Sequence, residues 1–290
     1  QWWGDVTSEM IMTMYSMDSN SYLLYQKGVE AMLLHAGDTK VLQTVVPISG
    51  DYFELPVQQL AGIVGFLTYY EYTGDEKIKE LALKYQAGLE PLRFRKDDHD
   101  IGFQLMCSYG NCLRLTEDQT CVPVLIDGAN SLASRFDPEV GCTRSWSFGK
   151  WSFPVIVDNM MNMELLLKAA ELGGSDSLKN VALAHARTTM KNHFRDDKSC
   201  FHLVDYNPET GEVAGKQTVQ GLADDSAWAR GQAWGLYGFT MVYRFCKEQD
   251  ILDHAIAIAE YLLPRLPEDG VPFWDYDSAE IPNDVRDASA

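Results

Sequence analysis

Two aspartates stand where a carboxyl group could act as a general acid or base. Asp100 lies in "DDHDIGF", and Asp158 follows the apolar run "FPVIV". Each immediately precedes a segment of helical periodicity, so each could instead cap a helix, and capping does not exclude catalysis. A carboxyl group that emerges from apolar surroundings has a raised pKa, which proton donation requires. The pair therefore predicts an acid/base site of the kind that glycoside hydrolysis uses.

Aromatic and imidazole side chains lie close to these aspartates in the sequence or in similar loops. Trp146 and Trp151 belong to "RSWSFGKWSF", a loop rich in Ser and Gly. Aromatic rings in such loops commonly stack on sugars. His99 and His202 lie in loops with aromatic neighbours and could either bind a substrate or serve the fold. No spacing of His with acidic residues predicts a metal site.

The segment "TVQGLADDSAWARGQAWGLYGF" (218–239) places polar and aromatic side chains at the front of an apolar helix. Arg230 and Trp234 are four residues apart, so they share one face of that helix. Arg230 could clamp a substrate carboxylate, or it could pair with Asp224 or Asp225. A helix that only packed against a core would need none of these polar groups, so we expect part of the segment to face a ligand.

The composition excludes several other classes of function. The chain of 290 residues carries a formal net charge of −18, which disfavours nucleic acid as a partner. No apolar run reaches the roughly 18 residues of a membrane span, so no membrane partner is expected. The six cysteines form no CxxC pair, and scattered buried thiols are favoured over disulfides. Residue 1 is Gln, so we expect a processed form or a fragment.

Helical periodicity runs through most of the chain and gives the elements that must position these residues. Helices are predicted over 21–36, 55–73, 75–90, 101–116, 119–135, 159–173, 176–193, 226–247 and 250–264. Short acidic turns join several of them in pairs, and long linkers separate the pairs. This alternation predicts an all-α ring or solenoid of helical hairpins, with function among the long linkers. One β-hairpin is predicted over 200–215.

Several long blocks resemble one known family. "HDIGF", "CSYGN", "FPVIVDNMMNMELL", "HLVDYNPETGEV" and "QGLADDSAWARGQAWGLYGF" are similar to blocks of glycoside hydrolase family 88, the unsaturated glucuronyl hydrolases. The resemblance covers roughly residues 70–290. It implies a six-hairpin α/α toroid, here a single domain over 1–290, with neither a metal nor an organic cofactor. It also implies a bacterial enzyme of the cytoplasm or periplasm.

The same resemblance implies a reaction and its substrate. The partner would be a short oligosaccharide with a 4,5-unsaturated uronic acid at its non-reducing end, as polysaccharide lyases release. The family hydrates the vinyl ether double bond, after which the sugar opens and releases the aglycone. By motif, Asp158 matches the general acid/base and Asp100 the second essential carboxylate. The substrate-contacting positions match His99, Trp146, His202, Gln220, Arg230 and Trp234.

Two parts of the chain depart from the family pattern. Residues 1–60 do not resemble the family, and the chain stops at "DVRDASA", where the family continues for several helices. The predicted ring is therefore open or incomplete at its C-terminal end. Two alternatives stay open at this point: an unsaturated rhamnogalacturonyl hydrolase with the same fold, and a catalytically inactive sugar-binding homologue. The oligomeric state is left open as well.

Overall fold

The computed structural model describes residues 54–290, so the predicted helix over 21–36 lies outside the described residues. The described chain divides into two compact units. The first contains residues 54–90 and 107–118, and the second contains Pro91–Met106 and Gln119–Ala288. Each unit is built mainly of helices, as the periodicity predicts.

The first unit contains a helical hairpin. Helix α4 (Glu54–Thr73) is followed by α5 (Glu76–Gln86) after a two-residue turn. Asp75 caps α5, because its Oδ1 accepts the backbone N–H of Lys77 at 2.9 Å. Helix α7 (Asn111–Thr116) packs against α4, and its Arg114 pairs with Glu71 at 2.6 Å. The acidic turn predicted to join two antiparallel helices here is confirmed.

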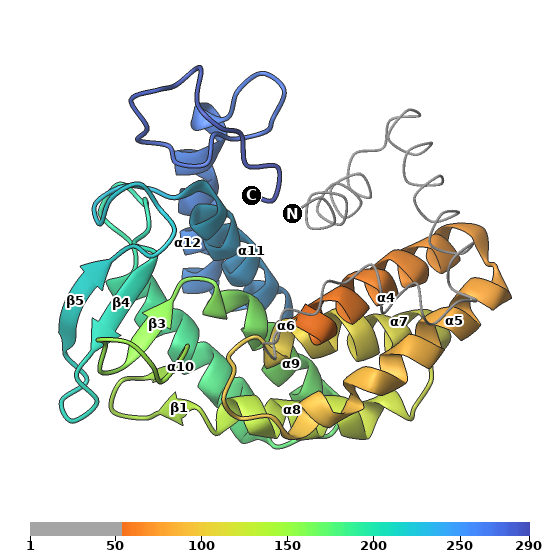
Figure 1. The fold of residues 1–290 in the computed structure, drawn as a ribbon. Helices are drawn as coiled ribbons and strands as arrows, with labels where there is room; N and C mark the ends of the chain where they lie inside the picture. The colour runs from red at the N-terminus through yellow and green to blue at the C-terminus, as the bar shows by residue number, and fades with distance from the viewer. Residues whose placement is uncertain (1–53) are drawn as a thin grey trace. The chain divides into compact units, whose positions relative to one another are not determined.

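The second unit is organised around helix α9 (Asn159–Glu171). The other helices of this unit are α6 (Ile101–Leu105), α8 (Cys121–Ala133), α10 (Asp176–Asn192), α11 (Ala229–Cys246) and α12 (Gln249–Leu262). Helix α9 packs against α6, α8, α10 and α11, while α12 packs mainly on α11 (Figure 1). The first turn of α9 follows Asp158, so the candidate acid lies where these helices meet.

Two contacts bring helices unusually close to the first turn of α9. A Cβ atom placed on Gly102 of α6 would lie 2.5 Å from the backbone oxygen of Asn162. A Cβ atom on Gly238 of α11 would lie 2.4 Å from the Cβ of Met160. Both distances are too short for real contacts, so α6 and α11 can approach α9 in this way only because glycine has no side chain.

Two small antiparallel sheets complete the second unit. Strands β1 (Phe136–Asp137) and β2 (Cys142–Thr143) form one of them. The other has the order β3-β4-β5, with the bounds Pro154–Ile156, Leu203–Tyr206 and Val213–Gln217 (Figure 1). Ile156 lies opposite Leu203, and the next N–H along, of Val157, donates to the carbonyl of His202 at 2.9 Å. Because Asp158 follows Val157, this pairing places His202 next to Asp158.

The helices begin and end within a few residues of their predicted bounds, with three differences. Residues 101–116 are interrupted by the π-helical turn η2 (Met106–Gly110), and residues 87–94 form a 3-10 helix. The helix predicted from residue 226 begins at Ala229. The predicted hairpin is confirmed as β4 and β5, whereas β1, β2 and β3 were not predicted. None of the described helices has the length and apolarity that a membrane crossing needs.

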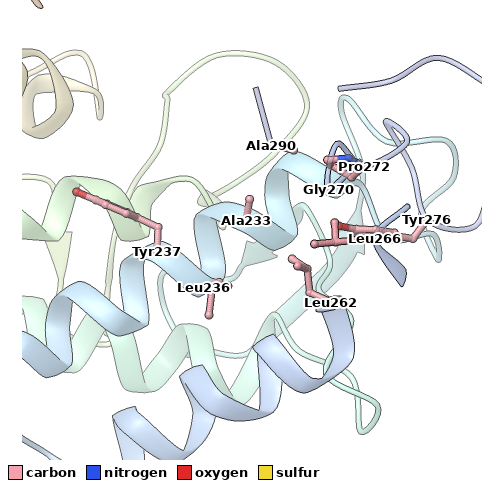
Figure 2. A pocket seen from close by; sticks show the side chains of 9 residues that line it. All are labelled: Ala233, Leu236, Tyr237, Leu262, Leu266, Gly270, Pro272, Tyr276 and Ala290. Carbon is pink, nitrogen blue, oxygen red and sulfur yellow. The ribbon is translucent and has the colours of Figure 1, made fainter. Parts of the chain in front are cut away.

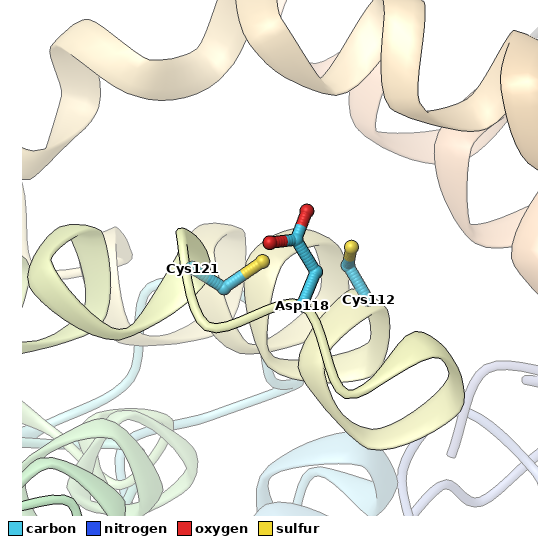
Figure 3. A group of neighbouring side chains, drawn as sticks. All are labelled: Cys112, Asp118 and Cys121. Carbon is cyan, nitrogen blue, oxygen red and sulfur yellow. The ribbon is translucent and has the colours of Figure 1, made fainter.

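Several cysteines are buried, as expected of thiols that serve packing. Cys112 is buried within α7, and Cys121 is the buried first residue of α8 (Figure 3). Cys142 and Cys200 are buried in the second unit. Burial raises the pKa of the Cys200 thiol to about 12, so this thiol stays protonated and unreactive.

Candidate functional site

Asp158 occupies the N-cap position of α9, but its side chain makes no capping hydrogen bond. The residue is only 8% exposed, and its Oδ2 atom is buried with no hydrogen-bond partner among the described residues. Burial raises the pKa of this carboxyl group to about 7, and the nearby Asp100 carboxylate adds to the rise while Arg230 opposes it. A carboxyl group of this kind can both donate and accept a proton near neutral pH.

Asp100 occupies the equivalent position before α6 and likewise makes no side-chain capping bond. Its Oδ1 accepts a hydrogen bond of 3.3 Å from Nδ2 of Asn162 on α9. The Nε2 atom of His99 lies 3.5 Å from the same oxygen. Both aspartates occupy N-cap positions, but neither side chain makes a capping hydrogen bond, so the alternative that they serve only as caps is wrong. Both carboxyl groups belong to one neighbourhood around the first turn of α9.

His202, the residue before strand β4, lies beside Asp158 and has a defined tautomer. Its Nδ1 accepts the backbone N–H groups of Val219 at 3.0 Å and Gln220 at 3.3 Å. Because Nδ1 is an acceptor, the ring proton lies on Nε2, 3.6 Å from Oδ2 of Asp158. Burial lowers the pKa of His202 to about 3, so the imidazole is neutral at physiological pH. It can donate one hydrogen bond into the site.

An aromatic cluster forms the neighbouring surface. The Trp146 ring stacks on Phe148 with a centroid distance of 5.6 Å and meets Trp151 edge-on at 5.5 Å. It also lies 6.1 Å from the His99 ring. Phe148 is 70% exposed, so the cluster reaches solvent. An exposed aromatic surface beside carboxylates is suited to the apolar face of a sugar.

Trp146 is tied to α9 through the residue before it. Ser145 Oγ donates to Oδ1 of Asn159 at 3.0 Å and accepts the backbone N–H of Ile156 at 2.9 Å. Asn159 Nδ2 in turn donates to the carbonyl of Thr143 at 2.8 Å. These buried bonds hold the aromatic loop against the helix that Asp158 precedes.

Arg230 and Gln220 meet at the start of α11. Arg230 Nη2 donates to Oε1 of Gln220 at 3.1 Å, and the guanidinium group lies over the Trp228 ring at 4.9 Å. Its Nη1 lies 3.8 Å from Oδ1 of Asp287. The alternative partners that the sequence suggested were Asp224 and Asp225, whereas the carboxylate beside Arg230 here is that of Asp287, from the C-terminal segment, which the sequence did not indicate.

The structure thus brings most of the predicted site residues into pairs. His99 lies beside Asp100 and Trp146, His202 beside Asp158, and Gln220 beside Arg230. Trp234 is half-buried on α11, and its ring contacts Tyr237 at 6.4 Å.

Two neighbours of the site were not predicted. Asn162 follows Asp158 by four residues and so shares its helix face, a signal that the sequence carried. Asp287 had no such signal, because it is far from Arg230 along the chain.

Two further features lie near the candidate residues. Ligand atoms of Asp98, His99 and Asp100 lie within 4.8 Å of one another, but Arg95 already pairs with Asp98 at 3.2 Å. The cluster is therefore neutralised in part by a protein cation. A cavity of about 290 Å³ lies beside α11 and the C-terminal segment, lined by residues that include Ala233, Leu262 and Tyr276 (Figure 2). It is lined by none of the predicted site residues.

The sequence and the fold of this chain were compared with those of known proteins. No protein-family model matches the chain. An unsaturated glucuronyl hydrolase of Formosa agariphila is 42% identical over 226 residues, which are 76% of this chain and 56% of that protein. One from Bacillus sp. (strain GL1) is 36% identical over 229 residues, 76% of this chain and 60% of that protein. This chain is a homologue of the unsaturated glucuronyl hydrolases.

A solved unsaturated glucuronyl hydrolase extends the similarity to the fold. The crystal structure of an unsaturated glucuronyl hydrolase specific for heparin superposes with a TM-score of 0.76 at 41% identity. The match covers 80% of this chain and 63% of that one. The helical fold and the family resemblance are therefore confirmed, and the chain spans less than two thirds of the length of the unsaturated glucuronyl hydrolases that it matches.

Proposed function

We propose that this chain is part of a glycoside hydrolase that removes a 4,5-unsaturated uronic acid from the non-reducing end of lyase-generated oligosaccharides. The observation that carries the proposal is the buried Asp158 carboxyl group, with its pKa raised to about 7 and Nε2 of His202 3.6 Å away. Hydration of a vinyl ether needs one group that first gives a proton and then takes one. A carboxyl group that is protonated about half of the time at neutral pH suits both steps.

In the proposed reaction, Asp158 donates its proton to C4 of the unsaturated sugar while a water molecule adds to C5. The resulting carboxylate accepts a proton from that water, which restores the acid. The product is a hemiketal at C5, which opens the ring and then releases the aglycone as an alcohol. His202 donates a hydrogen bond from Nε2 to the carboxylate or to the sugar, since its other nitrogen is occupied by two backbone N–H groups.

The remaining residues are assigned to binding the substrate. Asp100 is the exception: as the second catalytic carboxylate it holds both the substrate and the proton network around Asp158. His99 holds sugar hydroxyl groups near the proton donor, and Trp146 stacks on a sugar ring. Gln220 and Arg230 contact one another and hold the uronic carboxylate. Trp234, one turn further along α11, contacts the substrate beside them. The net charge of −18 makes such a local cation necessary for an anionic sugar. Neither the reaction nor these contacts call on a metal or an organic cofactor.

The architecture that we propose is a closed ring of helical hairpins. Helical hairpins joined by short turns, with candidate site residues in the longer connections, support a six-hairpin α/α toroid. On this view residues 1–290 belong to a single toroid domain. The similar hydrolase of known structure that is specific for heparin supports glycosaminoglycan-derived substrates.

The test replaces Asp158 by Asn and measures turnover. Asn is nearly isosteric and caps helices about as well as Asp, so the fold is expected to persist. Activity is followed as loss of ultraviolet absorbance by unsaturated disaccharides from chondroitin, hyaluronan, heparin and rhamnogalacturonan. Asp158→Asn is expected to lower kcat by about 10²–10⁴-fold on the accepted substrate, because general acid/base catalysis is lost.

A matched control is Asp127→Asn, whose carboxylate pairs with Arg93 at 2.6 Å. This variant is expected to keep parental turnover with a small loss of stability. Turnover by Asp158→Asn within a few-fold of the parent would show that the catalytic assignment is wrong. A parent that cleaves only the rhamnogalacturonan substrate would point to the related hydrolase. One that binds the sugars without cleaving any would point to an inactive homologue.

A further inference from the structure

The first turns of α6 and α9 approach each other at one point, where Gly102 meets Asn162. A Cβ atom on Gly102 would lie 2.5, 2.6 and 2.8 Å from the backbone oxygen, Cα and Cβ of Asn162. Each helix is preceded by one of the two candidate carboxyl groups, Asp100 and Asp158. The closeness of the two helices therefore controls how the two carboxyl groups face one another.

The side chain of Asn162 connects the two helix starts. Its Oδ1 accepts the backbone N–H of Phe103 on α6 at 2.7 Å, and its Nδ2 donates to Oδ1 of Asp100 at 3.3 Å. Asn162 is fully buried, so water does not compete for either bond. The bond to Phe103 fixes the orientation of the amide, and that orientation presents the N–H₂ group to Asp100. The Asp100 side chain is 37% exposed and would otherwise rotate among several rotamers.

We infer that Asn162 is a positioning residue that, with Gly102 allowing the helices to meet, holds the Asp100 carboxylate in place beside Asp158. This inference rests on the proposed function for its catalytic meaning. Asn162 does not contact the sugar in this assignment; it acts through Asp100. The negative charge held there also favours the protonated form of Asp158, in keeping with the direction in which Asp100 moves the pKa of that group.

A kinetic double-mutant cycle tests whether Asn162 acts through Asp100. The four proteins are the parent, Asn162→Ala, Asp100→Asn and the double variant, assayed on the unsaturated disaccharide that the parent accepts. Asn162→Ala is expected to lower kcat by up to about a hundredfold, the cost of misplacing a reacting group by about 1 Å. Added to Asp100→Asn, it should cause little further loss. Losses that multiply in the double variant would overturn the inference.

A second measurement does not depend on activity. Asn162→Asp keeps the oxygen that accepts from Phe103 but places a carboxylate against Asp100, so the midpoint of thermal unfolding should fall. Adding Asp100→Asn exchanges the two groups and restores one amide-to-carboxylate hydrogen bond, so the midpoint should rise again. An exchanged protein that unfolds at or below the midpoint of Asn162→Asp would overturn the contact.

The two measurements separate the inference from the proposed function. A parent that is inactive on every disaccharide would refute the proposed function, and the exchange experiment would then decide the positioning contact alone. An active parent with a rescued midpoint and multiplying kinetic losses would keep the contact and remove its catalytic role. That result would overturn the inference as stated.

Discussion

Arg230 lies between a neutral and an acidic partner, Gln220 at 3.1 Å and Asp287 at 3.8 Å. If it holds the uronic carboxylate, Arg230→Ala should lower kcat/KM on an unsaturated disaccharide by one to two orders of magnitude. This corresponds to about 1.5–3 kcal/mol, the value of a charge-assisted hydrogen bond. Steady-state kinetics on the purified variant provide the measurement.

Arg230→Lys is the matched control for this prediction. Lys keeps the positive charge but loses the planar fork that binds a carboxylate with two parallel bonds. We expect it to recover only part of the loss. A kinetically normal Arg230→Ala protein with a lowered midpoint of unfolding would instead assign the guanidinium group to holding the C-terminal segment through Asp287.

Single residues also show how far the sequence reaches. The raised pKa of Asp158 was predicted from the apolar "FPVIV" before it, because burial of a carboxyl group depends on its near neighbours along the chain. The tautomer of His202 was not predictable in this way. It is set by the N–H groups of Val219 and Gln220, which tertiary folding brings to Nδ1.

Among the elements, the contact between α6 and α9 is the most sensitive to a single added methyl group. Gly102→Ala would place its Cβ within 2.8 Å of three Asn162 atoms, two of them backbone, so the helices must separate. Overpacking of this kind costs about 1–3 kcal/mol of stability. We expect a lower midpoint of unfolding together with a lower kcat, because the separation moves Asp100 away from Asp158.

Gly65→Ala in α4 is the control for the same chemical change. Among the described residues, and apart from the backbone of its own helix, no atom lies within 4 Å of a Cβ at that position, and alanine is the better helix former. This variant should be at least as stable as the parent and equally active. If Gly102→Ala behaves in the same way, the close approach of α6 and α9 does not limit the site.

The helices were predictable because apolar residues repeat with helical spacing and capping residues such as Asp75 and Ser175 mark their starts. Strand β3 was missed, because a short apolar run is ambiguous between a strand and a buried helical segment. The π-helical turn at Met106–Gly110 was also missed, since one extra residue in a turn leaves no clear mark on the apolar pattern.

For the second unit as a whole, four buried histidines predict sensitivity to acid. Burial lowers the pKa of His185 and His202 to about 3 and that of His193 and His254 to about 4. In the unfolded chain each would titrate near 6.5. The stability they contribute is therefore complete above about pH 6.5 and is lost as the pH falls towards 4, because the unfolded state takes up the protons.

Asp158 acts in the opposite direction, since its carboxyl group is protonated in the folded state up to about pH 7. At pH 5, unfolding of the described residues should therefore take up about three protons, four by the histidines less one released by Asp158. Urea titrations at several pH values measure this number from the slope of the unfolding free energy. A slope near zero between pH 4.5 and 6 would contradict the neutral state of these histidines.

At the scale of the whole chain, the sequence predicted a helical fold and a resemblance to the unsaturated glucuronyl hydrolases that the comparisons bear out, because blocks such as "FPVIVDNMMNMELL" are long enough to be specific. The closed toroid stays a prediction. Closure of a ring depends on contacts between its first and last hairpins. Such contacts join residues far apart in the sequence, so local sequence patterns do not predict them.

The glycines at positions 102 and 238 have a consequence for how the sequence can evolve. Every mutation of a glycine codon that changes the amino acid adds atoms, and at these two positions the space is already filled by Asn162 and Met160. A lineage could accept a side chain there only after the start of α9 had shifted. Substitutions in α6, α9 and α11 should therefore be epistatic, each tolerated or lethal according to what the other helices already carry.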